Sequence, residues 1–136
     1  MATGCSLEAL QWLTFVDECD QRLTKSDGTR VRIEHKFFRG EVKFNEWEID
    51  GYAEVDGQKL FYEFLGCYFH PGCPHCGNGA DSDERFERKK SDLEKSGTVI
   101  IMRGCQWKIQ AKKLSDRVTP AFPDVMNIFR NCSIFV

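Results

Sequence analysis

The sequence predicts a mixed α/β fold in which helices cover both faces of a central sheet. Segments with helical and with strand periodicity follow one another in the order helix, three strands, helix, strand, helix. Asp56-Gly57, between two strand-like segments, is a strong hairpin signal. Residues 59–65 are apolar almost throughout, which is typical of a strand that is covered on both faces.

A helix is predicted over residues 6–24, and Ser6 can cap its N-terminus. The apolar residues that recur at three- and four-residue spacing along one face are Leu7, Leu10, Leu13 and Val16. The polar segment 25–30 then forms a turn.

Three strands should follow this turn. Residues 31–38 alternate between apolar and charged side chains, which is the period of a strand. The second strand is expected from Glu41 to about Tyr52, and the third, over residues 59–65, returns after the Asp56-Gly57 turn.

A second helix is predicted after a loop over residues 66–80 that is rich in Cys, His, Gly and Pro. It begins with an Asp81–Glu84 capping box and stops at Gly97. The large apolar residues within it are Phe86 and Leu93. With so few apolar residues, this helix should lie on the surface of the domain.

The remaining elements are a short buried strand over residues 98–102 and a last helix around 124–131. We expect a single domain over residues 1–136, with a core over 6–110 and a C-terminal tail and helix over 111–136.

Composition and charge narrow the class of protein. No apolar run has the length of a membrane span, and the N-terminus lacks a basic region followed by an apolar stretch. We therefore expect an intracellular protein that is neither secreted nor inserted in a membrane. The net charge of −2 argues against a highly basic, non-specific nucleic-acid binder. It does not exclude a nuclease, whose active site is itself acidic. A protein partner and the oligomeric state are left open.

Seven cysteines are too many to be incidental, and seven is an odd number for a disulfide framework. The candidate zinc ligands Cys67, His70, Cys73 and Cys76 follow one another at the short spacings of zinc sites, and Cys105 can close a site from a distant part of the chain. Such a zinc would be structural. The alternative is a set of buried free thiols.

The acidic residues Asp50 and Glu63 lie on either side of the predicted hairpin, so they can come close together. A carboxylate in so apolar a strand as that of Glu63 is costly unless it is paired or binds a cation. With Glu41 as a third ligand, they offer an oxygen-rich site for Mg²⁺ or Mn²⁺. The alternative is that Asp50 belongs to a turn, Glu41 is solvated and Glu63 pairs with an arginine.

The runs IDGY, LFYEFLGCYFHPGCPHC and VIIMRGCQW resemble the PD-(D/E)XK, or restriction-endonuclease-like, nuclease superfamily. The most similar branches are the very-short-patch mismatch-repair endonucleases and the nuclease-like regions associated with protein-primed family B polymerases of viruses and transposons. The resemblance covers residues 6–110 in order and is specific over 49–76 and 99–107. It implies a three-layer fold with a central mixed sheet, a structural zinc and metal-dependent phosphodiester hydrolysis.

For the catalytic site, the resemblance implies that Asp50 and Glu63 bind the catalytic metal, with Glu41 as an upstream acidic partner. His70 matches an active-site histidine that can act as a general acid.

For the zinc site, Cys67 and Cys105 match ligands directly, and Cys73 and Cys76 supply the other two. A set in which His70 replaces one of the cysteines remains open.

One position departs from the family pattern. Leu65 stands two residues after Glu63, where the superfamily has a lysine and closer relatives often have a histidine. The positive charge that would help to position water or stabilise the transition state is missing there. The basic residues that can substitute are Lys43, Lys59, Arg88 and Lys89.

Nucleic-acid contacts are expected from Arg85, Arg88 and Lys89 on the second predicted helix, although acidic neighbours also allow a merely solvated surface. Tyr68 and Phe69 match aromatic residues that wedge into the duplex in the mismatch endonucleases, and packing around zinc is the alternative.

We therefore predict a metal-dependent endonuclease, with DNA favoured over RNA as substrate and a nuclear location following from that substrate. The alternative is a catalytically inactive module of the same fold that binds nucleic acid or a protein partner. Leu65 favours the module, and the three acidic residues favour the enzyme.

Overall fold

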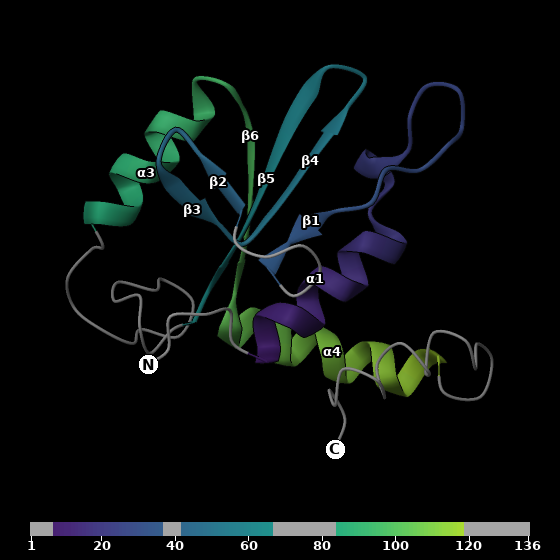
Figure 1. The fold of residues 1–136 in the computed structure, drawn as a ribbon. Helices are drawn as coiled ribbons and strands as arrows, with labels where there is room; N and C mark the ends of the chain where they lie inside the picture. Colours follow the sequence, from purple (N-terminus) through teal and green to yellow (C-terminus); the bar gives the residue numbers. More distant parts are fainter. Residues whose placement is uncertain (1–6, 37–41, 67–83, 119–136) are drawn as a thin grey trace.

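The computed structural model describes residues 7–36, 42–66 and 84–118, with side chains up to Ser115, and shows an α/β fold (Figure 1). A four-stranded sheet has the order β1-β4-β5-β6, and a separate two-stranded sheet pairs β2 with β3. The strands are β1 Glu34–His35, β2 Val42–Phe44, β3 Trp47–Ile49, β4 Gly51–Val55, β5 Gln58–Leu65 and β6 Gly97–Arg103. The helices are α1 Leu7–Cys19, the short 3₁₀ helix η1 Gln21–Leu23, α3 Glu84–Glu94 and α4 Gly104–Val118.

The predicted Asp56-Gly57 hairpin is confirmed. Both turn residues have positive φ, 50° at Asp56 and 82° at Gly57, as the tight turn between two antiparallel strands requires. The strands that it joins, β4 and β5, pair antiparallel from Gly51 opposite Tyr62 to Val55 opposite Gln58. Strand β6 then pairs with β5 in parallel. A parallel pair needs a crossover connection, and α3 lies within it.

Strand β5 separates two cores because its side chains alternate between the faces of the sheet. Leu60, Tyr62 and Phe64 belong to the larger core, which also contains Trp12 of α1 and Trp107 of α4. The opposite face carries a smaller cluster of Ile49, Phe61 and Leu93, the last of these from α3. The prediction of helices on both faces of a central sheet is therefore confirmed.

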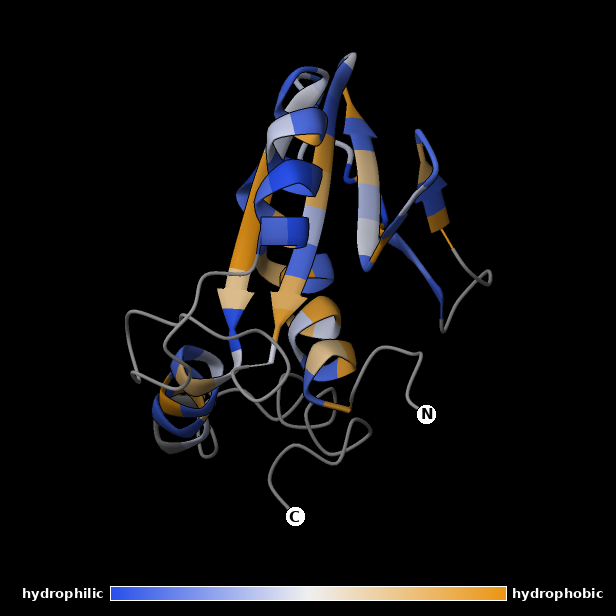
Figure 2. Ribbon diagram, turned by 90° about the vertical axis from the view of Figure 1, so that its left-hand side faces the viewer, coloured by the Kyte–Doolittle hydropathy of each residue, from blue (hydrophilic) through white to orange (hydrophobic). Residues whose placement is uncertain are grey.

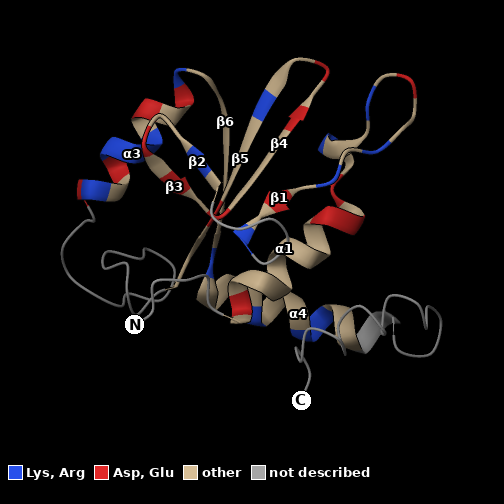
Figure 3. Ribbon diagram, in the orientation of Figure 1, with Lys and Arg blue, Asp and Glu red and all other residues tan. Residues whose placement is uncertain are grey.

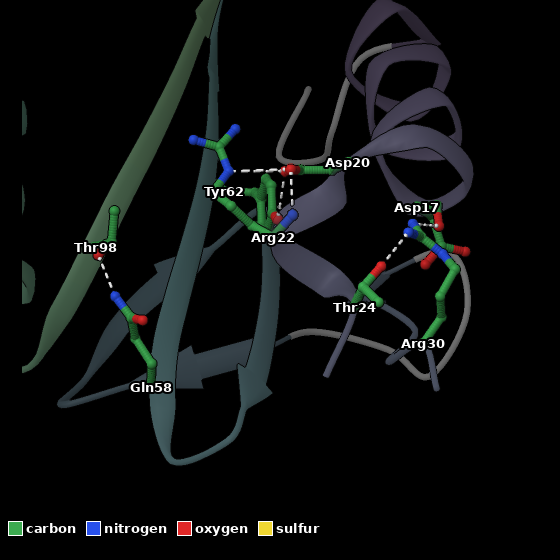
Figure 4. Close-up of polar contacts among 8 residues, drawn as sticks. All are labelled: Asp17, Asp20, Arg22, Thr24, Arg30, Gln58, Tyr62 and Thr98. Atoms are coloured by element: carbon green, nitrogen blue, oxygen red, sulfur yellow. Dashed lines mark hydrogen bonds and ion pairs between the residues drawn. The ribbon is translucent and has the colours of Figure 1, made fainter. Parts of the chain in front are cut away.

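Polar contacts fasten the larger core to the segment after α1 (Figure 4). The hydroxyl of Tyr62 donates to Asp20 Oδ2 at 2.8 Å, and Arg22 Nε donates to Asp20 Oδ1 at 3.0 Å. Near the other end of β5, Gln58 Nε2 donates to Thr98 Oγ1 of β6 at 3.0 Å. Tyr62 is thereby held toward α1, and its neighbour Glu63 faces the other side of the sheet.

The first predicted helix is shorter than expected. The α-helix ends at Cys19, and Asp20 then caps η1 by accepting a hydrogen bond from the N–H of Arg22. The expected apolar face is also partly wrong, since Leu7 is 53% exposed whereas Trp12 and Leu13 are buried. The large indole of Trp12 turns the buried face of the helix toward the sheet.

The strand predictions before the hairpin need two corrections. Of the segment 31–38, only Glu34 and His35 pair as a strand within the described part. The long strand expected up to Tyr52 is broken into β2, β3 and β4. The break between β3 and β4 is at Asp50, and the break between β2 and β3 follows from Asn45 and Glu46, whose φ angles of 50° and 72° form the turn of a second hairpin. Neither residue is a glycine, so the turn has little signature in the sequence.

The second predicted helix is confirmed as α3 between Glu84 and Glu94, and its two large apolar residues, Phe86 and Leu93, are buried. Figure 2 shows that α3 is otherwise mostly hydrophilic and lies beside strands that are largely hydrophobic. Gly97 does not end this helix but begins β6. A Cβ at this position would lie 2.3 Å from the backbone oxygen of Lys59, so the parallel pairing requires glycine there.

Helix α4 was not predicted, and β6 is half-buried along its length rather than buried. The signal for α4 is the spacing of Trp107, Ala111 and Leu114, which all pack in the larger core. The expected helix around 124–131 and the capping residue Asp81 lie outside the described residues. Among the helices of the described ranges, none combines the length and the apolar character needed to cross a bilayer.

Candidate functional site

Asp50 and Glu63 meet at one end of the hairpin and hold each other in place. The backbone N–H of Asp50 donates to Glu63 Oε2 at 3.1 Å. In return, the backbone N–H of Phe64 donates to Asp50 Oδ2 at 2.8 Å. The side chain of Glu63 is only 3% exposed. The sequence-based expectation that the hairpin brings these two carboxylates together is confirmed.

The start of β4 explains how Asp50 reaches this position. Gly51 pairs with Tyr62, which places the preceding residue, Asp50, level with Glu63. A Cβ on Gly51 would lie 2.8 Å from Leu13 Cδ2 and 2.9 Å from Ile33 Cγ2. The absence of a side chain at Gly51 therefore lets β4 pack closely against the larger core and fixes the position of Asp50.

A lysine completes this pair of carboxylates. Lys89 Nζ donates to Glu63 Oε1 at 2.5 Å, and the lysine side chain is only 14% exposed. Lys89 can reach inward because it lies three or four residues from Phe86 and Leu93, on the same side of α3. Leu65 carries no charge, and the lysine that contacts the acidic pair comes from a different element, the helix α3.

The electrostatics of the site suit a bound cation. Burial is the main cause that raises the pKa of Glu63 to about 7, and the charge of Asp50 raises it further. The charge and hydrogen bond of Lys89 act in the opposite direction and lower this pKa. A buried carboxylate that repels a neighbouring carboxylate is relieved by a divalent cation, and oxygen ligands are those that Mg²⁺ and Mn²⁺ prefer.

The other basic residues named as substitutes lie elsewhere. Lys59 approaches Glu54 at 3.9 Å near the far end of the hairpin, and Lys43 is exposed on β2. Arg88 is exposed on α3. Of the four candidates, Lys89 is the one that contacts the acidic pair.

Helix α3 carries charges of both signs along its exposed side (Figure 3). The guanidinium of Arg85 lies 5.6 Å from the centre of the Trp47 ring. Trp47 Nε1 in turn donates to Asp92 Oδ2 at 2.7 Å, which ties the β2–β3 hairpin to α3. Arg85 and Arg88 are both exposed, so they remain available to an external ligand.

Of the predicted zinc ligands, the described residues include Cys105, which is half-buried in the first turn of α4. Strands β5 and β6 are parallel and level at Leu65 and Arg103, so the chain leaves both strands at the same edge of the sheet. Cys67 and Cys105 each follow two residues later in the sequence. Within residues 7–36, 42–66 and 84–118, no three His, Cys, Asp or Glu side chains gather as a metal site.

The remaining predicted site residues lie outside the described part of the chain. They are Glu41, Cys67, Tyr68, Phe69, His70, Cys73 and Cys76.

Arg103, the last residue of β6, is a further charged residue of this region that was not predicted. Its signal in the sequence is a charged residue at the end of the apolar run 99–102.

Comparison of the chain with models of protein families, with curated proteins and with solved structures found no match.

Proposed function

We propose that this protein is a metal-dependent endonuclease that hydrolyses phosphodiester bonds in nucleic acid, with DNA favoured over RNA. The observation that carries the proposal is the convergence of Asp50, Glu63 and Lys89 at one end of a central hairpin. Two carboxylates and a lysine are the side-chain types that the PD-(D/E)XK pattern joins in one site. The fold-family assignment itself is part of this proposal, and a DNA substrate implies an intracellular, nuclear location.

Asp50 and Glu63 would hold the Mg²⁺ or Mn²⁺, with Glu41 as a third ligand. The cation, when bound, would activate water and stabilise negative charge on the phosphodiester. The hydrogen bond from the N–H of Phe64 orients the carboxylate of Asp50, and the N–H of Asp50 orients that of Glu63. Because both donors are backbone groups, one in β5 and one directly before β4, the two carboxylates are preorganised for their ligand.

Lys89 would supply the positive charge of the site. Its Nζ contacts Glu63 Oε1 and can also donate to a water molecule or to a phosphate oxygen as negative charge develops. The same charge stabilises the ionised form of Glu63, which is the form that binds a cation. Lys89 on α3 would thus supply the positive charge that Leu65, at the position of the family's lysine, cannot supply.

The other roles rest on the resemblance. Exposed Arg85 and Arg88 would contact backbone phosphates, and His70 would donate a proton to the leaving oxygen. Tyr68 and Phe69 would contact the bases. A structural zinc would be held by Cys67, Cys73, Cys76 and Cys105. The shared edge at which β5 and β6 end supports the pairing of Cys67 with Cys105.

The experiment is a cleavage assay on labelled duplex, mismatched and single-stranded DNA and on RNA, with and without added Mg²⁺ or Mn²⁺. Wild type is compared with Asp50→Ala and Glu63→Ala, and the zinc content and far-UV circular dichroism of each protein are measured to exclude misfolding. We expect cleavage that requires the added metal and is lost in both variants. Cleavage that persists in both folded variants would place the reaction elsewhere.

The second candidate is a module that binds nucleic acid or a protein partner without cleaving. The observation in its favour is the Lys89–Glu63 contact, because an ion pair that already satisfies a buried carboxylate can be purely structural. Tight binding of nucleic acid by folded wild type, with no cleavage of any substrate at any metal concentration, would favour this module.

A further inference from the structure

Arg103 lies on the same face of the sheet as the acidic pair. It ends β6 opposite Leu65 of β5, and Ile101 lies opposite Glu63 two residues earlier. Because side chains alternate along a strand, Arg103 projects from the face that carries Glu63. Diagonal neighbours on one face lie about 7–8 Å apart, which is within reach of a long side chain.

Arg103 is half-buried, and one nitrogen of its guanidinium lacks a hydrogen-bond partner among the described residues. Its Nη1 atom is buried and has no hydrogen-bond partner in the part of the chain that the structure describes. Burying a polar donor without a partner costs free energy, so this nitrogen calls for a hydrogen-bond acceptor that is not among the described residues.

The nearby carboxylate of Glu63 does not fill this role. Its Oε1 accepts from Lys89 Nζ and its Oε2 accepts from the N–H of Asp50. Glu63 is therefore held toward α3 and the hairpin, and the ligand of Arg103 has to come from another source.

We infer that Arg103 binds a backbone phosphate of the nucleic acid that enters this site, an inference that rests on the proposed function. A guanidinium offers a planar fork of donors that matches two phosphate oxygens. Arg103 on β6 and Lys89 on α3 both present positive charge on the face that holds Asp50 and Glu63. A phosphate held by Arg103 would keep the adjoining part of the strand beside the carboxylates.

The test measures binding of a fluorescent duplex as a function of salt concentration, without added divalent metal so that the substrate is not cleaved. Arg103→Ala should weaken binding about tenfold, since a charged hydrogen-bonding contact is lost. It should also lower the slope of log affinity against log salt by about 0.9, the value for one phosphate contact on a duplex. Arg103→Lys should keep the slope and recover part of the affinity.

The matched control is Lys108→Ala, which removes one positive charge from the other side of the sheet. Lys108 is exposed on α4 and approaches Glu8 of α1 at 3.8 Å, and both helices pack in the larger core. This variant should bind with the slope of wild type. Thermal unfolding completes the test, because the buried Nη1 of Arg103 makes no hydrogen bond within the described chain, so Arg103→Ala should not lower Tm.

An unchanged slope together with a lower Tm in Arg103→Ala would overturn the inference and assign Arg103 a structural partner within the chain. The same binding data separate the two proposals. If binding depends on Arg103 but no added metal supports cleavage, the proposed nuclease activity is wrong and the proposed phosphate contact of Arg103 stands. No binding of any nucleic acid by folded wild type would overturn both.

Discussion

Glu63 is a buried carboxylate in the middle of an apolar strand, and its hydrogen-bond partners make this position possible. Its neighbours on β5 are apolar and buried, and a carboxylate among them costs free energy unless it is paired, hydrogen-bonded or bound to a cation. Lys89 and the N–H of Asp50 occupy its two oxygens, and the charge of Lys89 favours the ionised form of this carboxylate.

Replacing Lys89 by methionine tests whether this lysine takes part in the reaction. We expect a loss of about 100-fold in kcat, the size typical of removing one donor that stabilises developing charge. The loss of Lys89 also raises the pKa of Glu63, so the pH profile of cleavage should move to higher pH. A lysine that takes no part in the reaction would leave kcat close to that of wild type once the pH is high enough to ionise Glu63.

The control for this variant is Lys90→Met. Lys90 is the next residue on α3 and approaches Glu94 at 3.6 Å, so its removal takes away the same charge from the surface of the same helix. Its kcat should stay close to that of wild type, and equal losses in the two variants would contradict a specific role of Lys89.

The raised pKa of Glu63 predicts how stability changes with pH. Burial raises this pKa from 4.5 to about 7, so the folded protein binds more protons than the unfolded chain between these values. Without added divalent metal, this contribution is complete below about pH 4.5 and is lost as the pH rises through about 7, a change of at most about 3 kcal/mol. Urea unfolding across this range should show the loss in wild type and a flatter curve in Glu63→Gln. The same slope in both proteins would assign the pH dependence to other groups.

At the scale of elements, the site depends on the close parallel pairing of β5 with β6. Gly97 permits this pairing, because any Cβ there would meet the backbone of Lys59. Gly97→Ala should cost at least about 2 kcal/mol of unfolding free energy, since one strand must move. Urea denaturation measures the cost.

Gly28→Ala is the matched control for that prediction. Gly28 has a φ of +90° but no atom within 4 Å of an added Cβ, so it carries backbone strain without a clash. Its cost should be about 1 kcal/mol. A smaller cost at Gly97 than at Gly28 would mean that β5 and β6 can separate without consequence.

The elements that could be predicted from the sequence are those with local signals. Asp56-Gly57 marks the central hairpin, and Phe86 and Leu93 mark the buried side of α3. The turn at Asn45-Glu46 could not be predicted, because two non-glycine residues adopt positive φ without a recognisable turn motif. Helix α4 was not predicted, although Trp107, Ala111 and Leu114 recur at the helical period and pack in the larger core.

The same limit applies to the candidate site. The pairing of Asp50 with Glu63 follows from the register of one hairpin and could be predicted. The choice of Lys89 over Lys59 or Arg88 depends on how α3 packs against the sheet. Contacts between distant segments of this kind carry no periodic signal in the sequence.

At the scale of the whole molecule, zinc would join the ends of β5 and β6 to the loop between them. Cys105→Ser should lose the bound zinc, measured by metal analysis, and lower Tm by at least about 5 °C. Cys19→Ser is the control, because Cys19 is an exposed thiol at the end of α1 and should keep the zinc of wild type. Equal zinc content in the two variants would remove Cys105 from the zinc site.

Titration of the protein with Mn²⁺, followed by electron paramagnetic resonance, tests whether Asp50 and Glu63 bind a divalent cation, and it requires no knowledge of the substrate. Wild type should bind Mn²⁺ up to millimolar concentrations, and Asp50→Asn should not. Asp56→Asn is the control, because Asp56 lies in the same hairpin and accepts a hydrogen bond from the N–H of Ser26, away from the site. If Asp50→Asn binds Mn²⁺ as well as wild type and Asp56→Asn do, the acidic pair is not a metal site and the account fails.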